Sequence, residues 1–241
     1  MRMLVMELKK EKRTGIKTVL LAAGVAGAAY AVANFLVRKD ALLRLPMAPM
    51  DILLTQLYGV ILMMNMFGII VAATMIYQME FKGNAVRKMC LLPVSVSAIY
   101  KRKFSVLSGM LFVAVVVQNL TLAQLGMRYL PVGVFEGLTV LRFTGYSFAT
   151  AMPVVSFMLF ISSCSENMWV VIGVGVAGFL SGMALVVSET EVFLLHPFVV
   201  MLQPALAMSA QPDNGIINIA VLQTVFWFLA GVWKAKYLCC E

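Results

Sequence analysis

Long stretches without a charged residue constrain the fold of this chain more than any other feature of its sequence. A helix needs about 20 residues to cross the hydrocarbon core of a bilayer, and seven stretches are long enough, of which the one over residues 192–212 is interrupted. Apolar residues make up 62% of the 241 positions and charged residues only 12%, whereas about a quarter of an average soluble domain is charged. We therefore expect an all-α integral membrane protein whose residues 1–241 form a single transmembrane domain. The predicted spans cover residues 18–37, 54–77, 104–125, 143–163, 167–188 and 214–233.

The segment before the last span is apolar but interrupted. Residues 192–212 contain three prolines, at positions 197, 204 and 212, and proline breaks or kinks a helix. Irregular backbone at membrane depth is tolerated only where protein or water satisfies its polar groups. We therefore expect residues 189–213 to form a broken outer hairpin, re-entrant or interfacial, and we expect six spans rather than seven.

The positions of the basic residues predict how the chain is oriented. Lysine and arginine accumulate in short cytoplasmic loops. With six spans and the N-terminus inside, 14 of the 19 basic residues lie on the inner side, whereas a seventh span would move Lys234 and Lys236 outside. We expect a multi-pass protein with both termini in the cytoplasm. Its net charge of +8 then reflects topology and lipid contact, not nucleic-acid binding.

The residues before the first span have the pattern of a helix that lies on the membrane surface. Met1, Leu4, Val5 and Leu8 fall on one stripe, and a lysine cluster follows them. We expect an amphipathic elbow helix over residues 1–14, and a solvated basic tail is the alternative. A cleaved signal peptide is disfavoured, because the apolar run continues past its small residues.

The sequence offers neither a set of catalytic groups nor an energy source. Its single histidine, His196, has no partner in view, and the predicted spans contain no acidic residue, so an intramembrane enzyme is not expected. Gly83 and Lys88 lack the spacing of a phosphate-binding loop. We expect no catalytic residue, metal or cofactor in this chain. If it transports a compound, a partner must supply the energy.

A basic loop over residues 80–103 joins the second and third predicted spans. Asn84 is a good N-cap, and Pro93 would end a short helix that starts there. Ser95 or Ser97 can cap the helix that continues into the third span. We therefore expect a short cytoplasmic helix parallel to the membrane within this loop.

This loop resembles the pattern of a glutamate, a glycine, a basic residue, a leucine and a proline found between the second and third spans of ABC-2 type ABC transporter permeases. Lys103, at the start of the third span, is part of the same likeness. The family often has a basic residue where Val96 and Ser97 stand here. In length the chain is similar to the lantibiotic-immunity and bacitracin-export branch. The matching residues are Glu80, Gly83, Arg87, Leu92 and Pro93.

The resemblance implies a permease subunit of an ATP-driven exporter in a bacterial plasma membrane. ATP and magnesium would bind two copies of a separate cytoplasmic ABC ATP-binding subunit, and a second permease, identical or homologous, would complete the pathway. The cargo implied is an amphipathic peptide antibiotic or similar compound, as in lantibiotic or bacteriocin immunity and drug resistance. The loop would be the coupling helix, and its implied contacts with the ATPase are Glu80, Phe81, Gly83, Asn84, Arg87, Lys88, Leu92 and Pro93.

Two alternatives stay open. Glu80 and Arg87 can instead be an interfacial charged pair that anchors the loop, and the whole chain can be a non-transporting scaffold or sensor that binds a cytoplasmic partner through it. Glycines in the first and fifth spans allow close helix packing, either between two permeases, as the resemblance implies, or within one chain. These glycines are Gly24, Gly27, Gly178 and Gly182. The substrate-binding residues are unknown from sequence.

Overall fold

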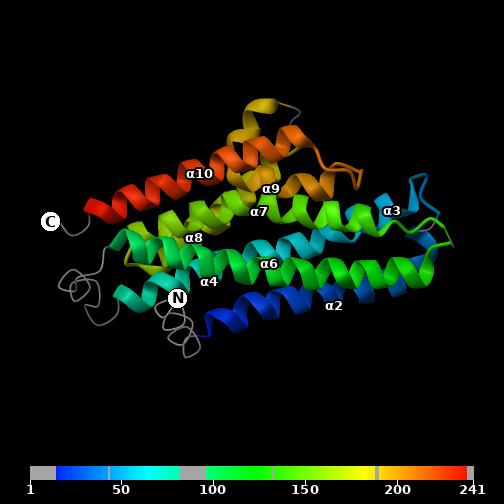
Figure 1. Cartoon of the computed structure of the whole chain (residues 1–241), viewed down its shortest axis with the longest axis horizontal. Helices are drawn as coiled ribbons and strands as arrows, with labels where there is room; N and C mark the ends of the chain where they lie inside the picture. The colour runs from blue at the N-terminus through cyan, green and yellow to red at the C-terminus, as the bar shows by residue number, and fades with distance from the viewer. Residues whose placement is uncertain (1–14, 43, 82–95, 132, 188–189, 238–241) are drawn as a thin grey trace.

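A computed structural model of the chain describes residues 15–42, 44–81, 96–131, 133–187 and 190–237 (Figure 1). These residues form helices and connecting turns, and no strand occurs among them. Six of their helices are long and apolar enough to cross a membrane, which confirms the predicted all-α membrane fold. They are α2 (Ile16–Leu42), α4 (Tyr58–Phe81), α6 (Val96–Tyr129), α7 (Gly137–Cys164), α8 (Met168–Leu185) and α10 (Asn214–Tyr237).

Most of these helices extend beyond the predicted spans. Helix α6 begins at Val96 and carries Lys101, Arg102 and Lys103 in its first turns, and α10 carries Lys234 and Lys236 in its last turn. Charged residues mark where a helix leaves the hydrocarbon, but they do not end its backbone hydrogen bonding, and cations are favourable in a last turn. The charge-free stretches therefore locate the spans but underestimate the lengths of the helices.

The helices run back and forth along one bundle. The start of α2, the end of α4, the start of α6 and the end of α10 lie at the same end of it (Figure 1), which we call the loop end because residues 82–95 connect α4 to α6 there. Helix α2 packs on α4 and α6, and α7 packs on α4, α6 and α10. Before α4, the short helix α3 (Pro49–Asp51) and the π-helix η1 (Ile52–Gln56) lie at the opposite end (Figure 1).

The interrupted segment before α10 forms two short helices, η2 (Glu191–Leu195) and α9 (Pro197–Leu206). The ten residues of α9 are too few to span a membrane, which confirms that this segment adds no seventh span. Helix α9 contacts α4, α7, α8 and α10, and its Phe198 and Val200 are fully buried. Protein therefore surrounds most of α9, whereas Val192 and Leu195 of η2 are exposed. One oxygen of Asp51 accepts a hydrogen bond from the Ala210 amide at 2.8 Å and holds the chain that follows α9.

Two amide side chains join three helices inside the bundle. Asn65 of α4 and Gln118 of α6 exchange hydrogen bonds of 2.8 Å in both directions. The Gln118 amide also donates to the Gly24 carbonyl of α2 at 3.2 Å. Both side chains are buried, where a polar group is costly without a partner. The pair therefore fixes how α2, α4 and α6 are rotated relative to one another.

A double-mutant cycle tests this pair. We expect Gln118→Met to lower the free energy of unfolding by about 1–2 kcal/mol, because it leaves the Asn65 amide without its partner. Asn65→Leu should lower the free energy of unfolding by less, because the Gln118 amide can still donate to the Gly24 carbonyl. The double variant should lose less than the sum of the two single variants when unfolding is measured in mixed micelles. Strict additivity would contradict the pairing.

Candidate functional site

The structure describes the backbone of two of the predicted coupling residues. Glu80 and Phe81 belong to the last turn of α4, and their role toward a partner stays a prediction. The remaining predicted coupling residues lie outside the described part of the chain, as do the predicted elbow helix over residues 1–14 and the predicted loop helix. Those outside residues are Gly83, Asn84, Arg87, Lys88, Leu92 and Pro93. The site is therefore built from the helix ends that carry the loop.

Lys103 joins the two helices that flank the loop. Only 2% of its surface is exposed, and its Nζ donates to the Ile76 carbonyl of α4 at 2.9 Å. The same nitrogen lies 3.8 Å from the centroid of the Tyr77 ring. A cation is favoured near the carbonyl end of a helix and over the face of an aromatic ring. Lys103 thus fastens the start of α6 to the last part of α4.

Two further polar contacts join helices at the same end. The Gln78 amide of α4 donates to the Glu166 carbonyl, in the turn between α7 and α8, at 2.6 Å. Lys234 of α10 donates to the Ser163 carbonyl in the last turn of α7 at 2.9 Å. In both, a long side chain crosses to a neighbouring helix and ends on a main-chain carbonyl. α4 is thereby joined to the α7–α8 turn, and α10 to α7.

An aromatic contact joins α6 to α10. The Tyr100 ring is 1% exposed and lies against the backbone at Gly231, where even a Cβ atom would overlap it. Phe228, one turn earlier, lies with its ring centroid 5.9 Å from that of Tyr100 and 4.7 Å from that of Phe104. Because no side chain intervenes at Gly231, the two helices approach closely.

The four contacts form a closed circuit, which we call the loop-end ring. It runs from α4 to the α7–α8 turn through Gln78, from α7 to α10 through Lys234, from α10 to α6 through Tyr100, and from α6 back to α4 through Lys103. The sequence pattern included Lys103 but did not indicate its partner, and it predicted no contact for Gln78, Lys234 or Tyr100. A long polar or aromatic side chain at the end of an apolar run is the signal they share.

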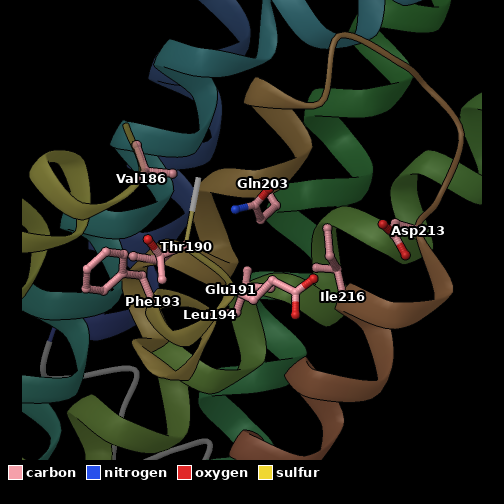
Figure 2. Close-up of a pocket in the computed structure, with 9 residues that line it drawn as sticks. Val186, Thr190, Glu191, Phe193, Leu194, Gln203, Asp213 and Ile216 are labelled. Carbon is pink, nitrogen blue, oxygen red and sulfur yellow. The ribbon is translucent and has the colours of Figure 1, made fainter. Parts of the chain in front are cut away.

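A cavity of about 290 Å³ lies beside η2 and α9, away from the loop end. Figure 2 shows the Glu191 side chain extending from η2 toward Ile216 of α10, with Gln203 of α9 near it. One Asp213 oxygen accepts from the Gly215 amide at 2.7 Å. Carboxylate and amide oxygens beside apolar walls suit a cationic amphipathic group, and within the described ranges no three metal-binding side chains cluster. The cavity is lined by Val186, Thr190, Glu191, Phe193, Leu194, Val199, Gln203, Asp213 and Ile216.

His196 has a structural position at the start of α9. Its Nε2 lies 3.3 Å from the Ser181 hydroxyl of α8, and that hydroxyl also donates to the Gly178 carbonyl of its own helix. Burial lowers the pKa of His196 below its usual range, which favours the neutral ring. The contact joins α9 to α8.

The four predicted packing glycines all face other parts of the same chain. A Cβ at Gly24 would meet Ala114 of α6, and one at Gly27 would meet Gln118 of α6 and the Ile61 backbone of α4. At Gly178 and Gly182 it would meet Phe198 of α9. Packing within one chain, the second alternative left by the sequence, therefore accounts for them. A contact with a second permease through the same helices stays a prediction.

Comparison with known proteins gives one match. The family model described as ABC-2 family transporter protein matches residues 3–182, which is well over half of the chain. No curated protein and no solved structure matches. The matched range contains the predicted coupling loop and Lys103, whereas every residue that lines the cavity lies beyond it.

Two alanine substitutions in α8 test the glycine packing. Gly178→Ala would place a Cβ 2.5 Å from a ring carbon of Phe198, so we expect it to destabilise the folded chain by about 1–3 kcal/mol. Gly173→Ala is the control, because nothing lies within 4 Å of its Cβ position, and it should be neutral or slightly stabilising. Thermal unfolding in detergent measures both, and Phe198→Leu should partly rescue Gly178→Ala. A Gly178→Ala chain of normal stability that associates less with a second copy would instead place the contact between subunits.

Proposed function

This chain belongs to the ABC-2 transporter family, and we propose that it is an exporter permease that couples to its ATPase through residues 80–103. Family membership and six apolar helices make it the multi-pass transmembrane subunit of an ABC transporter, not the ATPase itself. We propose two copies of the ATP-binding subunit, which would hold ATP and magnesium, and a second permease, identical or homologous. The membrane would be a bacterial plasma membrane.

The observation that carries the coupling proposal is the bond from Lys103 to the Ile76 carbonyl. The loop is continuous with α4 and α6 along the chain, and a contact between these two helices makes their ends move together when the loop moves. Lys103 holds both flanking helices at the base of the loop, and the loop-end ring continues to α7 and α10. This arrangement favours a loop that transmits force over the alternative in which Glu80 and Arg87 only anchor the loop.

Charge supports an inward-facing loop end. Lys101, Arg102 and Lys236 lie in helix turns at this end, whereas Glu191 and Asp213 line the cavity away from it. Under the positive-inside rule, the loop end lies in the cytoplasm with both termini. The ATP-binding subunit would then reach the loop directly.

The proposed cargo is an amphipathic peptide antibiotic or a similar compound, which would make the protein an immunity or drug-resistance exporter. The cavity supports a cationic amphipathic cargo, because it places the carboxylates of Glu191 and Asp213 beside the apolar Phe193, Leu194 and Ile216. The 19 methionines supply adaptable apolar surface of the kind that accepts varied ligands. A scaffold or sensor without transport activity is the rival function.

Affinity purification from native membranes in mild detergent tests the coupling proposal. We expect a nucleotide-binding ABC subunit to co-purify with the natural chain. Arg87→Glu should lower its recovery by about tenfold or more, because reversing one charge of an interfacial pair costs about 2 kcal/mol or more. Lys236→Glu is the matched control, since it reverses an exposed charge at the same end outside the loop, and it should leave recovery unchanged.

A stable, monodisperse chain that recovers no ATPase would reject the exporter and favour the scaffold or sensor. Equal recovery with Arg87→Glu and Lys236→Glu would show that the ATPase binds elsewhere.

A second experiment tests the cargo class. Cells that express the permease with its ATPase are challenged with a cationic lantibiotic and, separately, with an uncharged amphipathic antibiotic. The double variant Glu191→Gln, Asp213→Asn removes both charges from the cavity while asparagine can still cap α10. We expect it to lose most protection against the cationic peptide only. Glu136→Gln, at an exposed carboxylate outside the cavity, should protect like the natural chain, and equal protection by all three would exclude this charge-based recognition.

A further inference from the structure

We infer that Lys103 is the positioning residue that passes movement of the 80–103 loop into the membrane helices. It does so by holding α4 and α6 together at the base of the loop. This inference rests on the proposed function, because it assigns a residue to the transmission of the ATPase's motion. It goes beyond that proposal by separating the residue that transmits motion from the residues that bind the ATPase.

The first argument is the burial of a lysine where an apolar residue would fit. Lysine is almost never fully buried without partners, and removing an ammonium group from water is costly. Lys103 is 2% exposed, and its ammonium group contacts the Ile76 carbonyl and the face of the Tyr77 ring. A methionine would fill similar space without that cost, so packing alone does not explain the lysine.

The second argument is the position of the bond in the chain. Its two residues are 27 positions apart, and everything between them is the end of α4, the loop and the start of α6. The bond therefore closes this segment at its base. While the bond holds, a partner that displaces the loop must move the adjoining ends of α4 and α6 together. Once the bond is gone, these two ends can move separately.

The third argument is the rigidity of what Lys103 holds. Helix α6 continues for 34 residues from Val96 to Tyr129 without a break, which is about 50 Å at 1.5 Å per residue. Its first turns also contact α10 through Tyr100. Motion applied beside Lys103 is therefore carried along α6 to the opposite end of the bundle, and sideways through the loop-end ring.

The experiment uses the full chain with its ATPase in nanodiscs, in a background with the four cysteines replaced by serine. A single cysteine at Leu138, which is 59% exposed at the start of α7, reports on the end opposite the loop. Its rate of reaction with a maleimide is compared without nucleotide and after trapping with ATP and vanadate. We expect the two rates to differ in the natural chain.

Lys103→Met should retain the ATPase and hydrolyse ATP but lose the nucleotide-dependent difference in labelling. Lys101→Met is the matched control, because Lys101 is exposed two positions earlier in the same helix, and it should keep the difference. Lys103→Arg keeps a cation and a hydrogen-bond donor, so this variant should show the nucleotide-dependent difference in labelling. If Lys103 had only a structural role, Lys103→Met would not retain the ATPase while losing the response at Leu138.

The inference is overturned if Lys103→Met keeps the labelling difference, or if the natural chain shows none. It is also overturned if the Lys103→Met complex no longer assembles, because Lys103 is then needed for folding instead. Failure of the proposed function gives a different result: the natural chain then binds no ATPase at all.

Discussion

Each peptide group that enters a bilayer needs a hydrogen-bond partner inside the protein, because hydrocarbon offers none. The six apolar helices meet this need within themselves, and buried hydroxyl groups follow the same rule. Thr74, Thr144 and Ser162 each donate to the carbonyl four residues earlier in their own helix. The short helix α9 meets the need differently, because it is enclosed by four other helices. Backbone hydrogen bonding therefore constrains this fold more than side-chain packing does.

Polar side chains that cross between helices are few, and their positions separate two mechanical regions. Asn65 and Gln118 lock α2, α4 and α6 in the middle of the bundle through paired amides. Lys103, Gln78 and Lys234 act at the loop end, where each reaches a main-chain carbonyl of another helix or turn. The amide pair therefore joins helices in the middle of the bundle, and the loop-end contacts join them beside the loop.

The sequence was sufficient for the class of fold, the six spans and the interrupted segment, because these depend on local composition. It underestimated α6 and α10, since charged residues at Lys101 and Lys234 continue a helix rather than end it. It could not identify the partners of Gln118 or Lys103, which depend on how helices are rotated against one another. Nor could it decide what the glycines contact: Gly178 allows a close approach, but only the fold shows that Phe198 fills the space. The cavity was missed because its walls come from η2, α9 and α10 together.

The contact of Tyr100 with Gly231 also limits how the sequence can change over time. The ring occupies the volume that any side chain at position 231 would need, so residue 231 cannot be enlarged alone without separating α6 from α10. A lineage that enlarges residue 231 must first, or simultaneously, shorten residue 100. The choice of residue at one site therefore limits the other, although the two are 131 positions apart in a chain of 241.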